Sequence, residues 1–344
     1  MYIPRALDTH EWIDEGASKI NKMKYSFSKI SKYKNECIIG LLLNLCIPLF
    51  SQEIRNSQSN NSPFLVILGT LQDGGSPHIG CKKNCCNQKD PSKKVVSIGV
   101  VDPTDNKKFL FEASPDIVDQ IKTLDEVAGN TSSKTIDGIF LTHAHIGHYS
   151  GLMYLGKEAW NAHSIQIFAM PKMKNFLEKN GPWSQLISLN NIKLLEIQNR
   201  QTKVISKNIN VTPYTVPHRD EFSETIGYKI KGVKKSALFI PDIDKWSKWD
   251  LDIKEMIKEV DYAFIDGTFF GVAELNNRNM AEIPHPLISE SIELFKALDE
   301  KEKNKIWFIH LNHSNPALDK NSAEHKLILE KGFHITEFGQ LFPL

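Results

Sequence analysis

The stretch IDGIFLTHAHIGH, residues 136–148, decides the fold. Its first half is a short apolar run typical of a buried strand, and its second half carries three histidines. In an extended chain His143 and His145 point the same way, so both imidazoles reach one ion, while His148 reaches a neighbouring ion. Because histidine is the commonest metal ligand, the stretch predicts a metal site at the end of a strand.

Around this stretch the chain alternates strand-like and helix-like segments from residue 64 onward. Strands are predicted over residues 64–69, 95–102, 108–113, 136–142, 164–169, 191–197, 210–216, 225–230, 236–241, 261–266 and 305–310. Helices are predicted over residues 171–179, 247–258, 286–298 and 320–331. Ser114 is expected to cap a further helix.

Residues able to do chemistry follow several of these strands, namely His218, Asp242, Asp266 and His310. Loops at strand ends are where a rigid sheet presents a site. Each of these residues alone is a weak signal, but their order along the chain is informative.

That order resembles the metallo-β-lactamase superfamily, whose motif is His-x-His-x-Asp-His after a buried strand. The resemblance covers residues 64–344 and implies the α/β class, as a four-layer αββα sandwich with the site along one edge. It also implies metal ligands: His143, His145 and His218 for a first ion, Asp242 as a bridge, and His148 and His310 for a second ion.

Gly147 stands where this motif has its aspartate, so one carboxylate of the second ion site is missing. One outcome is a single zinc on the three histidines of the first site, which suffices for catalysis when a position stays open for water. The other is a second ion on the remaining matched residues, helped by another carboxylate. Asp73 is a candidate by position, and it is equally a turn-forming residue before Gly74.

Longer strings are similar to one group of the superfamily, the pyrroloquinoline quinone biosynthesis protein B group. They are LGTLQDGGSPHIGC, FLFEASPDIVDQI, THAHIGHYSGL, PDIDKW, FIDGTFF and FIHLNHSNP. This resemblance implies a relation to cofactor maturation, for which hydrolytic and iron-dependent oxidative chemistry are both conceivable.

Cys81, Cys85 and Cys86 form a second candidate metal site within six residues. Three closely spaced thiols suit a tetrahedral zinc better than an odd-numbered disulfide set, and the group resemblance also implies a structural zinc here. His78 is near enough in sequence to be the fourth ligand. In an exported domain, the alternative is one disulfide with a spare thiol.

His285 lies before a predicted helix and after the strand that carries Asp266. In hydrolytic relatives a histidine in this region protonates the leaving group, which implies a catalytic role for His285 together with Asp242. A loop histidine before Pro286 is the alternative. Asp266 either orients a ligand histidine or caps a turn before Gly267.

Residues 1–51 differ in character from the rest of the chain. Residues 38–50, IIGLLLNLCIPLF, are apolar and follow several lysines, which resembles a secretory signal with a start at Met23 and cleavage near Ser51. The run is shorter than the roughly 20 residues of a membrane span, so no span is expected after cleavage. We expect a linker over residues 52–63, a domain over residues 64–344, and export to the periplasm. A cytoplasmic protein with a docked hydrophobic helix is the alternative.

The composition narrows the function further. The 344 residues carry 42 Lys+Arg against 41 Asp+Glu, a net charge of +1, which argues against a nucleic-acid partner. We therefore predict a zinc-dependent hydrolase that cleaves an ester, amide or phosphoester of a small molecule or peptide, with one or two active-site ions. An iron-dependent oxygenase and a non-catalytic cofactor-binding protein are the alternatives.

Overall fold

The computed structural model describes residues 62–87, 89–129, 135–274 and 284–344. The predicted signal segment, residues 1–51, and residues 52–61 of the predicted linker lie outside the described residues. The described residues all belong to one unit of the chain, Ser57–Leu344. Among them, no helix combines the length and the apolar character that crossing a bilayer requires.

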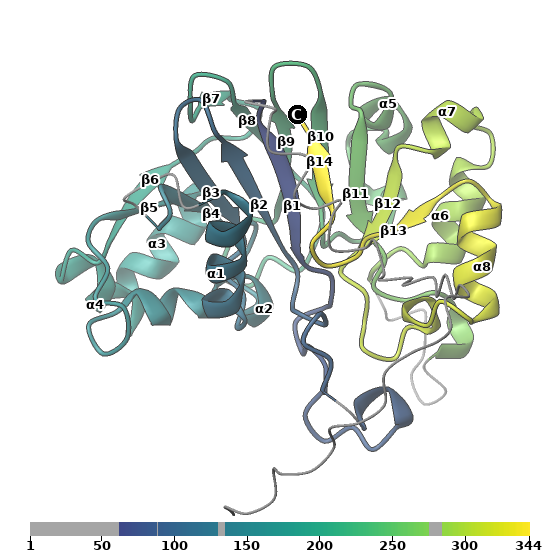
Figure 1. Ribbon diagram of the computed structural model, residues 1–344, viewed down its shortest axis with the longest axis horizontal. Helices are drawn as coiled ribbons and strands as arrows, with labels where there is room; N and C mark the ends of the chain where they lie inside the picture. Colours follow the sequence, from purple (N-terminus) through teal and green to yellow (C-terminus); the bar gives the residue numbers. More distant parts are fainter. Residues whose placement is uncertain (1–61, 88, 130–134, 275–283) are drawn as a thin grey trace, which may run out of the picture. The chain divides into compact units, whose positions relative to one another are not determined.

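Two mixed sheets form the centre of this unit (Figure 1). The order of the first sheet is β14 (Leu341–Pro343), β1 (Phe64–Gly69), β2 (Ser97–Asp102), β3 (Lys107–Phe111), β4 (Gly138–Phe140), β5 (Ile165–Ala169) and β6 (Ile192–Glu196). Strands β14 to β3 pair antiparallel, and β3 to β6 pair parallel.

The second sheet repeats this mixture of directions. Its order is β13 (His334–Ile335), β12 (Ile306–Ile309), β11 (Tyr262–Asp266), β10 (Ser236–Ile240), β9 (Ile226–Lys231), β8 (Asn210–Thr215) and β7 (Lys203–Val204). Strands β13 to β10 are parallel and β10 to β7 antiparallel, so β8 runs in the same direction as β10, β11 and β12. The carboxyl ends of these four strands therefore lie at one edge of the sheet.

The helices cover the outer faces of the two sheets (Figure 1). They are α1 (Ile117–Val127), α2 (Ile146–Tyr149), α3 (Pro171–Lys179), α4 (Trp183–Ser188), α5 (Ile253–Lys258), α6 (Ile288–Phe295), α7 (Glu300–Lys303) and α8 (Ala323–Glu330). Short 3-10 helices are η2 (Asn84–Cys86), η3 (Ser150–Leu155), η4 (Trp246–Lys248), η5 (Val272–Glu274) and η7 (Pro316–Leu318).

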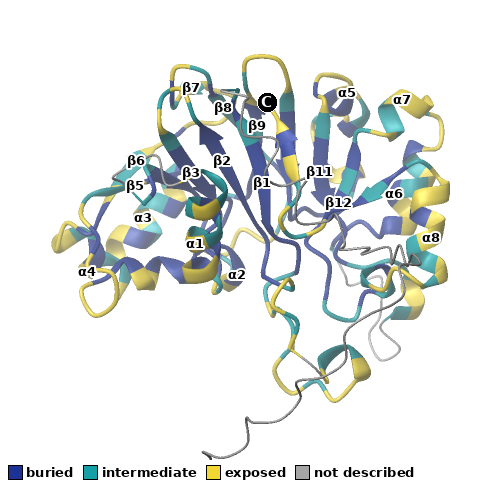
Figure 2. Ribbon diagram, in the orientation of Figure 1, coloured by how far each residue is buried: buried dark blue, intermediate teal, exposed yellow. Residues whose placement is uncertain are grey.

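Three apolar clusters hold the layers together. The cluster between the sheets contains Phe111, Phe140 and Tyr228, with the first two rings stacked 4.7 Å apart. The other two clusters lie between each sheet and its helices. Figure 2 shows the strands buried and the outer helix surfaces exposed, as this layering requires. The predicted four-layer αββα sandwich is confirmed.

One predicted helix, residues 247–258, is wrong in its first half. The α-helix begins at Ile253, because the Asp252 side chain accepts from the Lys254 amide and caps it there. The indoles of Trp246 and Trp249 are buried and donate to Ser291 Oγ and to the carbonyl of Thr215, which holds the preceding segment in a 3-10 turn.

The expected cap at Ser114 also differs from the structure. Asp116, not Ser114, precedes the first residue of α1. Ser114 Oγ instead donates to the buried side chain of Gln120 at 2.8 Å and accepts from the Asp116 amide.

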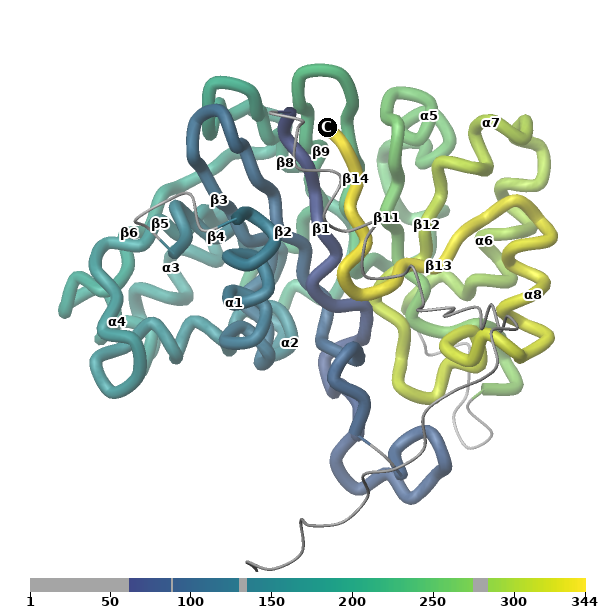
Figure 3. The backbone as a smooth tube through the Cα atoms, viewed as in Figure 1, coloured from purple at the N-terminus to yellow at the C-terminus, as the bar shows by residue number. Residues whose placement is uncertain are grey.

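A long excursion joins β1 to β2 and extends beyond the ends of the strands (Figure 3). At its base, Leu71 forms bridges with Val95 and with Leu311, and the Gln72 amide donates to the Leu311 carbonyl at 2.9 Å. Leu311 directly follows His310. The start of this excursion is therefore fixed beside the loop that follows β12.

Candidate metal centre

The histidine loop follows β4, and hydrogen bonds between its backbone and two side chains of other segments hold it in place. The Tyr228 hydroxyl donates to the carbonyl of Leu141, and the Ala144 amide donates to Ser223 Oγ at 2.9 Å. His145 has extended backbone angles and stands immediately before α2. The strand end thus presents His143 and His145 together, as the sequence predicts, and α2 brings His148 back to the same side.

Four predicted residues form a first cluster at this edge: His143, His145, His218 and Asp242. His145 Nδ1 lies 2.8 Å from His143 Nε2 and 3.3 Å from His218 Nε2. Asp242 Oδ2 lies 3.3 Å from the same two Nε2 atoms. All four ligand atoms therefore surround a common point.

These separations fit a tetrahedral ion. With zinc–nitrogen bonds of about 2.0–2.1 Å, two ligand atoms of a tetrahedral site lie about 3.3 Å apart. His145 Nδ1 is 3.9 Å from Asp242 Oδ2, the longest of these contacts. Without a cation, the Asp242 carboxylate oxygen could pair with all three imidazole nitrogens only if each of these nitrogens carried a proton. The donor set and its spacing fit zinc.

A second cluster contains Asp73, His148 and His310. Asp73 Oδ1 lies 2.9 Å from His148 Nε2 and 3.7 Å from His310 Nε2. Asp242 Oδ2 is 3.9 Å from His148 Nε2, so it lies between the two clusters. Asp73 Oδ1 and both Nε2 atoms are buried and make no well-aligned hydrogen bond within the part of the chain that the structure describes.

His285 lies next to these clusters, and two carboxylates hold its Nδ1. Asp266 Oδ2 is 2.9 Å and Asp242 Oδ1 is 3.2 Å from this nitrogen. Burial lowers the pKa of His285, but the charges of Asp266 and Asp242 outweigh burial and raise the pKa to about 9. The predicted catalytic pair, Asp242 and His285, is therefore in direct contact.

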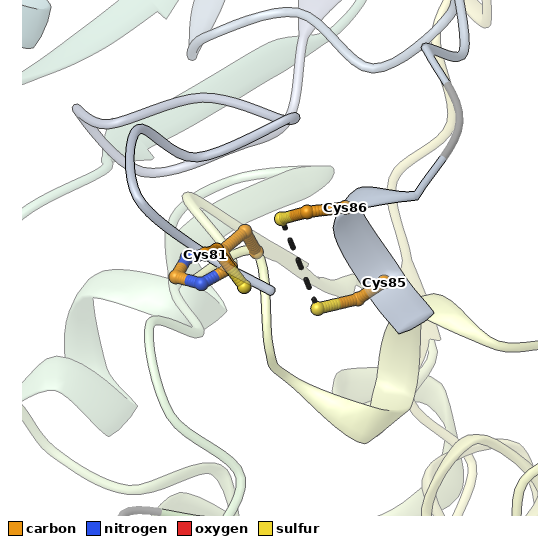
Figure 4. Close-up of side chains that lie close together, drawn as sticks. Cys81, Cys85 and Cys86 are labelled. Carbon is orange, nitrogen blue, oxygen red and sulfur yellow. Dashed lines mark hydrogen bonds between the residues drawn. The ribbon is translucent and has the colours of Figure 1, made fainter. Parts of the chain in front are cut away.

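The three cysteines lie together on the excursion between β1 and β2 (Figure 4). Their thiols are free, and the sulfurs of Cys85 and Cys86 are 3.9 Å apart, near the roughly 3.8 Å of two thiolates on one tetrahedral zinc. Burial and the neighbouring thiols of Cys86 and Cys81 raise the pKa of Cys85 to about 11.

The fourth member of this cysteine cluster is His313, not His78. The His78 ring stacks on His313 with centroids 4.3 Å apart, and its amide donates to Cys86 Sγ. The sequence favours His78 as the fourth ligand because it is near the cysteines along the chain. His313 is more than two hundred residues away in sequence and comes from the loop after β12.

Comparison with known families decides the relationship. The model of the beta-lactamase superfamily domain matches residues 107–311, more than half of the chain. The chain belongs to the beta-lactamase superfamily. The match includes the histidine loop, Asp242 and His310.

Full-length relatives narrow the likeness within the superfamily. The chain is 23% identical to coenzyme PQQ synthesis protein B of Methylorubrum extorquens (strain PA1), over 81% of this chain and 99% of that protein. The Zn2+-bound PqqB structure from Methylobacterium extorquens superposes with a TM-score of 0.69 at 22% identity, covering 82% and 100% of the two chains. A diphosphatase from the PhnP family superposes with a TM-score of 0.56 at 22% identity, covering 82% and 97%.

The histidines that match the superfamily motif are contacted by Asp244 and Thr268, which the sequence does not single out. Asp266 supports Thr268 and so has the orienting role, one of the two that the sequence predicts for it. Asp244 Oδ1 contacts His218 Nδ1 at 3.2 Å, and Thr268 Oγ1 contacts His310 Nδ1 at 2.9 Å. Asp266 Oδ1 in turn accepts from Thr268 Oγ1 at 2.7 Å. Such partners fix the ring orientation and the tautomer of a ligand histidine.

Glu112, after β3, orients a histidine of each cluster. Its Oε1 lies 3.1 Å from His148 Nδ1 and accepts a short hydrogen bond from Thr142 Oγ1, which is itself 2.9 Å from His143 Nδ1. Glu112 is fully buried and has a φ of 77°, a left-handed conformation that costs a residue with a side chain about 1–3 kcal/mol. His310 has a φ of 65° and bears the same kind of cost. In sequence, Glu112 is one acidic residue after an apolar strand, a signal too common to single out.

Charges within this site favour the cation-binding form of His143, Asp242 and Asp73, but not of every residue in it. Burial, helped by the charge of His148, holds the pKa of His143 well below its usual value, so this ring stays neutral and able to coordinate. Burial opposes ionisation of Asp242, but His285 and the ligand histidines outweigh burial and hold its pKa well below the usual range. Asp73 is likewise kept ionised against burial by His148 and His310. Burial lowers the pKa of His148 and of His218, yet Glu112 and Asp73 outweigh burial at His148, and Asp242 outweighs it at His218. Both pKa values are therefore raised, and an ion must displace a proton from each ring.

Proposed function

We propose that this chain is a metal-dependent hydrolase that cleaves an ester, amide or phosphoester bond in a small molecule or peptide. The observation that carries the proposal is the first cluster, whose ligand atoms are spaced for one tetrahedral ion. A zinc ion bound there acts as a Lewis acid and lowers the pKa of a water toward neutrality. The zinc-bound structural neighbour from Methylobacterium extorquens supports zinc as the first metal to test.

The protein residues then have separate tasks. His143, His145 and His218 would hold the ion, and Asp242 would contribute a negative charge between the two clusters. His285 has its Nδ1 engaged by two carboxylates, which leaves Nε2 to meet the substrate. Asp266 holds the Nδ1 side of the ring, so His285 is placed to donate a proton from Nε2 to a leaving group.

We also propose a structural zinc on Cys81, Cys85, Cys86 and His313. The support is the convergence of the four side chains and the separation of the Cys85 and Cys86 sulfurs. A site closed by four protein ligands has no position for a substrate. This ion would hold the excursion between β1 and β2 to the loop after β12, on which His313 lies.

Activity against simple chromogenic substrates tests the hydrolase proposal. We would strip the full chain of metal, add zinc back, and measure cleavage of p-nitrophenyl acetate and bis(p-nitrophenyl) phosphate. Zinc should restore cleavage in the wild type and not in His143→Ala, because that change removes a ligand of the first cluster. Cleavage that is equal in both proteins would contradict the proposal.

A second candidate is an iron-dependent oxygenase in the synthesis of a cofactor like coenzyme PQQ. The observation that favours it is the full-length likeness to coenzyme PQQ synthesis protein B, together with a histidine and carboxylate donor set that also suits iron(II). Oxygen uptake by ferrous protein in the presence of a tyrosine-containing peptide, without hydrolysis, would decide for this candidate. Ligand binding with neither activity would indicate a carrier protein.

A further inference from the structure

Position 147 is too crowded for the aspartate that the superfamily motif places there. A Cβ atom built on Gly147 would lie 2.3 Å from Asp73 Oδ1 and 2.6 Å from Asp73 Cα. Real Cβ contacts are essentially never below 3.0 Å. The Asp73 segment therefore occupies the space that a side chain at position 147 would need.

The Asp73 carboxylate also points at the ligands that such an aspartate would join. Its Oδ1 is 2.9 Å from His148 Nε2 and 3.7 Å from His310 Nε2, and all three atoms are buried. The arrangement without an ion is a protonated His148 that pairs with Glu112 through Nδ1 and with Asp73 through Nε2. That arrangement would leave His310 Nε2, which is buried, with no hydrogen bond among the described residues.

The backbone around Asp73 is built to hold it there. The Gln72 amide donates to the Leu311 carbonyl, and the Gly75 amide donates to the Gln72 carbonyl at 2.8 Å. Gly75 has a φ of 61°, which a residue with a side chain adopts only at a cost. This tight turn directs Asp73 toward His310, whose own segment pairs with Leu71.

We propose that Asp73 supplies the carboxylate ligand that position 147 lacks, so that Asp73, His148, His310 and Asp242 hold a second active-site metal ion. If the carboxylate comes from position 73 and not from position 147, a glycine is needed at position 147, because it leaves room for the Asp73 segment. The inference rests on the proposed metal-dependent function and adds the second ion and its ligand to it.

Two substitutions, at positions 73 and 147, test whether Asp73 is a ligand of the second ion. Asp73→Asn removes the charged ligand, while Gly147→Ala removes no ligand but pushes the Asp73 segment away from His148. Gly271→Ala is the matched control, since its Cβ would meet only Ser289 Oγ, at 3.7 Å. We would count zinc per full-length chain by elemental analysis after dialysis, and compare circular dichroism spectra to verify folding.

Both Asp73→Asn and Gly147→Ala should lose one zinc ion per chain relative to wild type, whereas Gly271→Ala should lose none. If Asp73→Asn does not fold, the zinc content of folded Gly147→Ala decides the test. If Gly147→Ala does not fold, the zinc content of folded Asp73→Asn decides it. Wild-type zinc content in both variants, which would mean an ion pair only, overturns the inference.

The same measurement distinguishes failure of the second-ion proposal from failure of the proposed hydrolase function. His143→Ala measured in parallel reports on the first ion. If His143→Ala lowers the zinc content and the Asp73 and Gly147 variants do not, the inference fails while the hydrolase proposal stands. If none of the three changes the zinc content, both fail.

Discussion

Replacing Glu112 should weaken metal binding at both clusters, although the residue belongs to neither. Its Oε1 meets His148 Nδ1 and Thr142 Oγ1, and its Oε2 accepts from the Thr142 amide at 3.3 Å. In Glu112→Gln, an amide oxygen at the Oε1 position still faces His148 Nδ1 and Thr142 Oγ1, but the amide nitrogen then faces the Thr142 N–H and cannot accept from it. The 3.1 Å contact to His148 Nδ1 also loses the negative charge of Glu112, and a contact between charged groups is roughly twice as strong as one between neutral groups.

The size of the effect follows from what each substitution removes. Partners that orient ligand histidines typically change metal affinity by about 10- to 100-fold. Glu112→Gln keeps a neutral acceptor and should cost about tenfold, or ~1.4 kcal/mol, for each ion. Glu112→Ala removes the acceptor entirely and should cost about 100-fold. Asp244→Asn is the control, because Asp244 contacts only His218 among the ligands and should weaken only the first ion.

The assay is zinc titration of metal-free protein against a chromophoric chelator, with thermal melting of the metal-free forms to separate folding from binding. Affinities within about twofold of wild type for both ions in Glu112→Gln would refute the reasoning. Weaker binding of the second ion alone would show that Glu112 does not act on His143 through Thr142.

Three other predictions concern the remaining parts of the molecule. His285→Gln should reduce turnover of alkyl esters by about 100-fold or more, because they need a protonated leaving group, and should barely change turnover of p-nitrophenyl esters; steady-state kinetics on both substrate types checks this. Cys86→Ser should lose the cysteine-site zinc and lower Tm by roughly 5 °C, as measured by elemental analysis and calorimetry, while zinc-dependent cleavage per active-site ion persists. If residues 1–51 direct export, the mature chain should begin near Gln52, and an intact N-terminus by mass spectrometry of the expressed protein would contradict it.

Local sequence patterns predicted most of the strands, because apolar runs ended by polar residues mark them. The sandwich was implied by the resemblance to the superfamily, which rests on the order of histidines and aspartates along those strands. The error at the start of α5 has a local cause, the Asp252 cap, and a long-range cause, the indole of Trp249, which donates to the carbonyl of Thr215.

The rest of the site depends on contacts between distant segments. Asp73 and His313 reach their clusters only because the excursion after β1 lies against the loop after β12. Glu112 and Asp244 are single acidic residues after strands, and their roles appear only when the histidines are placed. A motif therefore locates the ligands on one strand end, while the partners that orient them come from pairings that one sequence does not specify.

Anomalous diffraction would show whether the first cluster, His143, His145, His218 and Asp242, holds an ion. Crystals of protein purified without added metal would be measured at the zinc and iron absorption edges. We predict a zinc peak within bonding distance of His143 Nε2, His145 Nδ1 and His218 Nε2. Crystals that show metal at the cysteine cluster, and none among these three histidines, would contradict it.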